Sequence, residues 1–220
     1  MRALRLVLPI VLAALAVVPV RAETLTTGRD LDAESPMGKY LLSMDFYKRM
    51  HAIAVEADRV LGVRCDTRYE IRPLSVIVFK PVELPTGALH ATGGIWAYRF
   101  DANRCGTTKR YNLMMTSQPG AAPRAAMMVP GDTITSPLLA RDTIRSVAAK
   151  ASIALDGKCE KVQIFDTAVA EQPHAVTQGG TTYQGVWKEI WTFQGCGQRV
   201  PVPVIFVPDG KGGTNFFTED

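Results

Sequence analysis

The same order of hydrophobic and polar patterns occurs twice along the chain. Apolar residues recur at helical spacing between Ser35 and Leu61, and again between Ser136 and Leu155. This spacing predicts two amphipathic helices, each beginning at a Ser-Pro pair and ending before a glycine, Gly62 or Gly157. The residues expected on the apolar faces are Tyr40, Met44, Tyr47, Met50, Ala54, Ala57 and Leu61 in the first helix and Leu138, Ile144, Val147, Ala148, Ala151 and Leu155 in the second.

Strand patterns follow each helix. Residues 70–82 and 159–169 are rich in apolar and β-branched side chains, and glycine-rich segments follow them at 92–94 and 178–180. A strand containing Gly-x-Trp comes next, and turn residues at 118–120 and 208–213 predict a hairpin in each half. Large residues on both faces of the strand around Trp187 predict a sheet that is covered on both sides.

Identical spacing marks the two copies. Eight residues separate Gly94-Ile95-Trp96 from Cys105-Gly106, and eight separate Gly185-Val186-Trp187 from Cys196-Gly197. We therefore predict an α+β fold made by tandem duplication of a helix-plus-antiparallel-sheet unit with the element order α-β-β-β-β. This order is similar to that of cystatin-like and NTF2-like folds. The expected boundaries are 23–34 for an N-terminal extension, 35–131 for the first unit and 132–220 for the second.

The first 22 residues predict a cleaved signal peptide. Arg2 and Arg5 precede an apolar run, and Val20-Arg21-Ala22 suits cleavage after Ala22. An uncleaved membrane anchor is the weaker interpretation, because the run is short and contains Pro9. We expect a periplasmic or secreted protein without a stable membrane anchor.

Loss of this segment removes three arginines from 25 basic residues and leaves 22 against 21 acidic residues, so the formal charge falls from +4 to +1. Nucleic acid is then not an expected partner.

Four cysteines in an exported chain predict two disulfides. Four cysteines allow three pairings, and the repeat favours Cys65 with Cys105 and Cys159 with Cys196. Zinc binding is disfavoured because the cysteines are widely spread and no C-x-x-C occurs. We expect no cofactor.

The last 40 residues or so carry a G-x-W-x-E-x-W strand, a Cys-Gly pair and a D-G-x-G-G-T turn. The matching residues are Gly185, Trp187, Glu189, Trp191, Cys196, Gly197, Asp209, Gly210, Gly212, Gly213 and Thr214. In this pattern the chain resembles exported bacterial proteins of unassigned activity. The resemblance implies an exported globular domain and no particular chemistry.

Three groups of side chains are candidates for chemistry. Met114-Met115 and Met127-Met128 could bind Cu(I), but the second copy has Ile205-Phe206 and Phe216-Phe217 at the equivalent places, which favours core packing. His90 and His174 precede the glycine-rich segments and could share a metal or anion, although surface loop histidines are the simpler interpretation.

Glu189 lies between Trp187 and Trp191 and would act as a general acid only if burial raised its pKa. Motifs for a serine nucleophile, a zinc protease and a phosphate-binding loop are missing from the sequence.

These observations support three hypotheses in descending order. The first is a non-catalytic binding protein that holds a small apolar molecule or a peptide in a groove between two sheets. Its expected ligand-binding residues are Trp96, Tyr98, Phe100, His174, Trp187, Glu189 and Trp191. The second is an inhibitor or assembly partner of another envelope protein, with contacts at the glycine-rich segments. The third is a hydrolase or lyase that uses Glu189 with His174.

Overall fold

A computed structural model describes residues 24–25, 32–66, 68–155, 157, 159 and 161–219. The expected signal peptide, residues 1–22, lies outside these residues. The elements in chain order are β1 (Thr24–Leu25), α1 (Pro36–Leu41), α2 (Met44–Val60), β2 (Glu70–Glu83), β3 (Gly93–Arg104), β4 (Thr107–Gln118), β5 (Ala121–Met127), α3 (Pro137–Ala154), β6 (Gln163–Gln178), β7 (Thr181–Gly195), β8 (Gln198–Pro208) and β9 (Thr214–Thr218).

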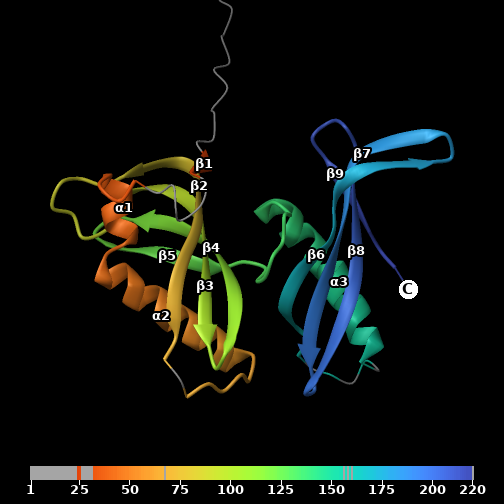
Figure 1. Ribbon diagram of the computed structural model, residues 1–220, viewed down its shortest axis with the longest axis horizontal. Coiled ribbons are helices and arrows are strands. Elements are labelled where there is room, and N and C mark those ends of the chain that lie inside the picture. The colour runs from red at the N-terminus through yellow and green to blue at the C-terminus, as the bar shows by residue number, and fades with distance from the viewer. Residues whose placement is uncertain are drawn as a thin grey trace, which may run out of the picture.

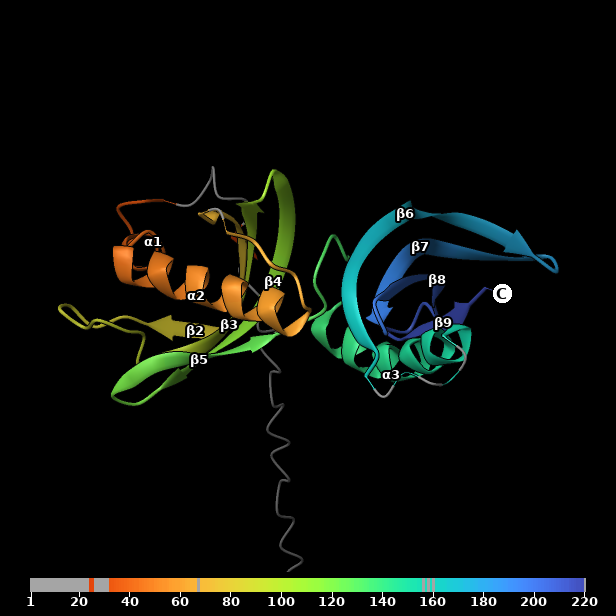
Figure 2. The same cartoon turned by 90° about the horizontal axis from the view of Figure 1, so that it is seen from below.

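The elements form two units, each with a long helix packed on its own antiparallel sheet (Figures 1 and 2). The first sheet has the order β1-β2-β3-β4-β5, and the second has β6-β7-β8-β9. The α+β class is therefore confirmed, and in each unit four consecutive antiparallel strands follow a long helix. The first unit differs from the expected order by the additional helix α1 and the additional strand β1. The two sheets are separate, and the cystatin-like or NTF2-like comparison stays a prediction.

The first helical segment is two helices, and the expected single helix from Ser35 is wrong. The Ser43 side chain accepts a hydrogen bond from the backbone N–H of Phe46 and caps α2, so the chain is extended at Ser43. The buried face of α2 is Phe46, Met50, Ala54 and Asp58, whereas Met44 is exposed. In α3, Leu138 is likewise exposed, and its buried residues are Ala140, Thr143, Val147 and Ala151.

Each Cys-Gly pair is the turn of a two-residue hairpin. Cys105 and Gly106 join β3 to β4, and Cys196 and Gly197 join β7 to β8. All four residues have positive φ, between 48° and 74°, which is the conformation of a type I′ turn.

Disulfides Cys65–Cys105 and Cys159–Cys196 tie these turns to the segments that follow the helices, with Cα–Cα distances of 5.8 and 5.7 Å. The pairing expected from the repeat is confirmed, and it indicates an oxidising compartment.

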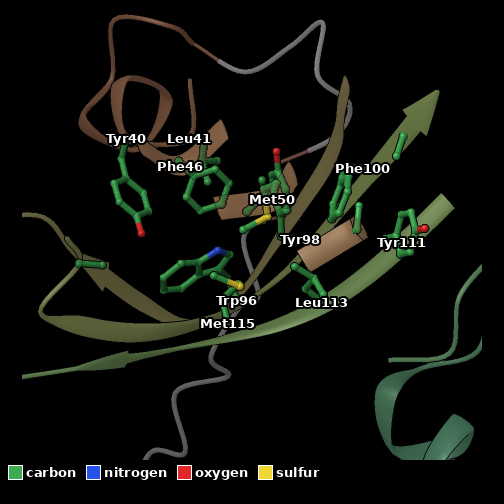
Figure 3. Packing of buried hydrophobic residues seen from close by; sticks show 14 of the residues in the cluster. Tyr40, Leu41, Phe46, Met50, Trp96, Tyr98, Phe100, Tyr111, Leu113 and Met115 are labelled. Atoms are coloured by element: carbon green, nitrogen blue, oxygen red, sulfur yellow. The ribbon is translucent and has the colours of Figure 1, made fainter. Parts of the chain in front are cut away.

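Each helix covers one face of its sheet and encloses a separate core. In the first core Trp96, Tyr98 and Phe100 of β3 pack beneath Phe46 and Met50 of α2 (Figure 3). In the second, Trp191, Phe193 and Phe206 pack with Val147 and Ala151.

The expected two-sided coverage of β7 is wrong. Trp187, Glu189, Trp191 and Phe193 share the buried face, while Lys188, Ile190 and Thr192 on the other face are only half-buried.

Candidate functional site

The aromatic residues expected to line one groove lie in two separate cores. Trp96, Tyr98 and Phe100 belong to the first core and are at most 1% exposed. Trp187 and Trp191 belong to the second core and are 9% and 0% exposed. The structure does not bring the two groups together, because each faces the helix of its own unit.

Glu189 is completely buried, and four donors surround its carboxylate. The indole N–H groups of Trp187 and Trp191 donate to it at 3.1 and 2.8 Å. The Thr133 hydroxyl donates at 2.8 Å, and the backbone N–H of Ile134 donates at 2.9 Å. Two of these donors, Thr133 and Ile134, lie outside the second sheet, so their hydrogen bonds to Glu189 attach the segment around Thr133 to that sheet.

The histidines lie away from Glu189 and in unlike surroundings. His174 is in β6, where it pairs with Val186, so the expectation of a loop is wrong at this position. Its Nδ1 lies 2.9 Å from the carbonyl oxygen of Gln172. His90 is in the loop before β3. Within the described residues, no group of three His, Cys, Asp or Glu side chains is arranged to hold a metal ion.

The methionines are not a cluster. Met115 is fully buried in the first core, as the comparison with Phe206 predicted, whereas Met127 is 43% exposed. Met127 and Met128 instead line a cavity between the units, which is described below.

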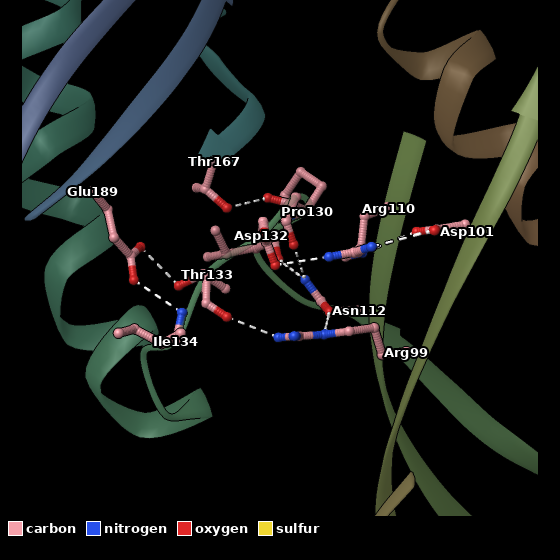
Figure 4. Close-up of polar contacts among 12 residues, drawn as sticks. Arg99, Asp101, Arg110, Asn112, Pro130, Asp132, Thr133, Ile134, Thr167 and Glu189 are labelled. Atoms are coloured by element: carbon pink, nitrogen blue, oxygen red, sulfur yellow. Dashed lines mark hydrogen bonds and ion pairs between the residues drawn. The ribbon is translucent and has the colours of Figure 1, made fainter. Parts of the chain in front are cut away.

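The linker between the units, residues 128–136, forms hydrogen bonds with both sheets (Figure 4). From the first unit, Asn112 donates to the carbonyl oxygens of Val129 and Gly131 at 2.7 and 3.0 Å, and Arg99 donates to that of Thr133 at 2.8 Å. From the second unit, the Thr167 hydroxyl donates to the Pro130 carbonyl oxygen at 2.6 Å.

The linker backbone also forms one hydrogen bond with each sheet. The Gly131 N–H donates to the Arg110 carbonyl oxygen in the first sheet at 3.0 Å, and the Asp132 N–H donates to the Thr167 carbonyl oxygen in the second sheet at 2.7 Å. Arg110 also forms ion pairs with Asp101 and Asp132, at 2.9 and 2.8 Å. These bonds hold the two units in one arrangement.

Gly131 is required where the linker crosses β6. Its φ is +94°, and a Cβ at this position would lie 2.3 Å from the Thr167 carbonyl oxygen and 2.5 Å from Asp166 Oδ1. Any other residue would therefore push the linker away from the second sheet.

A cavity of about 920 Å³ lies between the units, beside this linker. Its walls come from α2, β4, β5, the linker, α3, β6 and β7, and most of the side chains are apolar. They include Ala52, Ile53, Ala57, Val60, Leu113, Ala125, Met127, Val129, Pro130, Ala140, Ile144, Ala148, Val162, Ile164 and Phe193. This volume lies in the range of small-molecule sites, about 300–1,000 Å³. The charged side chains of this lining are Arg49, Glu56, Lys109 and Arg141.

Lys109 of β4 is the buried charged residue of this wall. It is 5% exposed, and its ammonium nitrogen lies 4.0 Å from the ring centroid of Phe165 in β6 and 5.8 Å from that of Tyr111. Desolvation lowers the pKa of Lys109 to about 8, against the opposing effect of Asp58 and Asp166.

A buried polar network adjoins the cavity at Tyr111. Asp58 of α2 accepts hydrogen bonds from Tyr69 at 3.0 Å, from Tyr111 at 2.8 Å and from the Arg104 guanidinium. Desolvation alone would raise the pKa of Asp58, but the hydrogen bonds and the charge of Arg104 lower it below its ordinary value. Asp58 and Arg104 therefore form a satisfied internal pair that joins the helix to the sheet.

Sequence reasoning missed the cavity and Lys109. Lys109 alternates with Tyr111, Leu113 and Met115 in β4, and this spacing of two places it on the inward face. That signal was available, but no local pattern shows that β6 and α3 complete the wall.

None of the helices in the described residues is long and apolar enough to cross a membrane. Comparisons of the chain with protein-family models, with curated proteins and with solved structures gave no match.

Proposed function

We propose that this protein is an exported binding protein, periplasmic after cleavage of its signal peptide, that holds a small apolar molecule in the cavity between its units. The carrying observation is the cavity of about 920 Å³ with apolar walls from both units. Binding of an apolar ligand is favoured here because its apolar surface is transferred from water to the apolar wall of the cavity. The exported location is supported by the N-terminal sequence and by the two disulfides.

The two units are, in this proposal, duplicated copies of one structural unit. Their common element order, their equivalent disulfides and their Cys-Gly turns support this origin. A cavity at the junction of two such copies uses surfaces that neither copy has alone.

The direct test is binding of Nile red, a neutral apolar fluorophore, to the mature protein. Ala148 lines the cavity from α3, whereas its neighbour Ala149 is exposed and does not line it. Ala148→Trp should fill the cavity and weaken binding at least about tenfold, and Ala149→Trp should leave it unchanged. A second pair on α2, Ala52→Trp in the wall and Val55→Trp outside it, guards against misfolding of the first variant.

Equal binding by the wall variants and their controls would contradict the proposal, provided that circular dichroism shows all four to be folded. Native mass spectrometry of protein from the host envelope adds an independent measurement. A reproducible added mass that is absent from Ala148→Trp would identify the natural ligand.

A second candidate function, contact with another envelope protein, is favoured by the outer part of the β6–β7 hairpin. Residues 170–184 are exposed except for the half-buried Val176, and the hairpin extends away from the rest of the sheet (Figure 2). Replacing this extension by a short Asn-Gly turn should abolish a specific cross-linked complex in the envelope if it is the contact site. An unchanged cross-linking pattern would refute this role.

A further inference from the structure

The cavity wall contains a buried cation, Lys109, whose ammonium group has no hydrogen-bond acceptor among the described residues. Only 5% of the Lys109 surface is exposed. A buried, unpaired charge costs several kcal/mol in a protein interior. A residue with this cost is expected where a ligand supplies the missing partner.

The buried Arg104 and the half-buried Arg99 have acceptors. Arg104 donates to Asp58 and Thr107, and Arg99 donates to Asn112 and to the Thr133 carbonyl oxygen. The fold therefore provides hydrogen-bond acceptors for these two guanidinium groups. Lys109 differs from them because it lines the cavity. Arg49 also lines the cavity: one of its terminal nitrogens donates to the Pro123 carbonyl oxygen, and the other has no acceptor among the described residues.

The carboxylates of Glu56 and Asp58 are paired with other side chains. Glu56 lines the cavity and forms an ion pair with Arg59 at 2.6 Å, and Arg141 of the wall pairs with Asp142 at 3.1 Å. The charged groups that act on Lys109 are Asp58, Asp166, Arg104 and Arg199. Asp58 is held by Arg104. Desolvation raises the pKa of Asp166, which weakens this carboxyl group as a counter-ion for Lys109. Glu56 of the lining is paired with Arg59, so Lys109 and Arg49 are the cations that the lining presents to a ligand.

We infer that the ligand of this cavity is an amphipathic anion, an apolar chain or ring system that ends in one carboxylate or similar acidic group, and that this group pairs with Lys109. The inference rests on the proposed function and adds the chemical class of the ligand. The apolar part would contact the walls from α2 and α3, and the acidic group would accept a charge-assisted hydrogen bond from the ammonium.

The test compares dodecanoate with dodecanol, which has the same apolar chain and no charge, by displacement of Nile red at pH 7. Wild type should bind dodecanoate at least about tenfold more tightly than dodecanol, as expected for a hydrogen bond to a charged group. Lys109→Met should reduce this ratio to about one, and Lys109→Arg should restore a clear preference for the carboxylate.

Lys39→Met is the matched control, because Lys39 is exposed and pairs with Glu34 at the surface. It should keep the wild-type ratio. The ratio in wild type should also fall as the pH rises above 8, where Lys109 loses its proton.

Equal affinity of wild type for the two ligands, or a preference that persists in Lys109→Met, would overturn the inference while Nile red binding and its loss in Ala148→Trp still supported the proposed function. If Nile red failed to bind, and isothermal titration calorimetry showed no binding of dodecanoate or dodecanol, the proposed function itself would be refuted. The two failures are thus distinguishable.

Discussion

Replacing Lys109 by methionine is expected to stabilise the ligand-free protein at neutral pH. Methionine retains most of the length of the side chain and removes the buried charge. The pKa of Lys109 falls from 10.5 to about 8 in the folded protein, a difference of about 2.5 pH units. At about 1.4 kcal/mol per unit, burial of the charged form costs about 3 kcal/mol.

The contact with Phe165 offsets part of this cost. The ammonium lies 4.0 Å from the ring centroid, and such an interaction contributes about 1 kcal/mol. The free energy of unfolding of Lys109→Met should therefore exceed that of wild type by about 2 kcal/mol at pH 7. Urea unfolding followed by tryptophan fluorescence measures this difference.

The pH dependence separates this explanation from improved packing. Below pH 8, Lys109 is protonated in both the folded and the unfolded state, so the cost is fully present. Between about pH 8 and pH 10.5, the unfolded wild type binds more protons than the folded one, and its stability rises with pH. The advantage of Lys109→Met should shrink over this range. An advantage that did not change with pH, or a variant less stable than wild type at pH 7, would refute the reasoning.

Three further predictions concern the buried polar groups and the linker. Glu189→Gln should lower the free energy of unfolding, measured in urea, by about 3 kcal/mol, because an amide cannot accept hydrogen bonds from all four donors around Glu189. The control Glu171→Gln, at an exposed position, should change it by less than about 0.5 kcal/mol. Similar effects of the two substitutions would contradict the role of Glu189 as a buried hydrogen-bond acceptor. The pKa of Asp58 is lowered in the folded state, so its contribution to stability is present above its ordinary pKa of 3.8 and is lost as the pH falls through the folded value. Asp58→Asn should accordingly be less stable at pH 7 and should lose less stability on acidification from about pH 5 to about pH 2; equal acid sensitivity would show that other carboxylates dominate. Gly131→Ala should lower the free energy of unfolding by about 2 kcal/mol or more. Gly120 also has a positive φ, but nothing lies within 4 Å of a Cβ added there, so Gly120→Ala should lower it by about 1 kcal/mol. Equal melting temperatures for these two variants would argue against the close approach of the linker to Thr167.

Local patterns predicted much of each unit. The β2 strand, the hairpins after each Cys-Gly pair and the two disulfides agree with the expectations from period, turn residues and repeat spacing. The break before α2 was missed because the apolar spacing continues across Ser43 and predicts one helix. The Ser43 side chain instead caps the start of α2 and interrupts the helix at this residue. The position of His174 was missed because β6 extends beyond the buried part of its sheet, where no hydrophobic alternation marks a strand.

The candidate site depended on information that no short segment contains. Glu189 was recognisable between two tryptophans, but its partners Thr133 and Ile134 come from the linker, more than 50 residues earlier in the chain. The aromatic residues were recognised as large and apolar, and large apolar residues in alternating strand positions serve a core as well as a groove.

The sequence by itself determined the run of a long helix followed by four strands in each unit and the pairing of the cysteines, because these follow from contacts and spacings within one unit. Tertiary structure alone decided that the aromatic faces lie under separate helices and that the cavity lies between the units. The physical reason is that the walls of the cavity, and the environment that lowers the pKa of Lys109, are made by surfaces from both units. Their approach is fixed by the bonds of the linker to each sheet, which are contacts over long sequence distances.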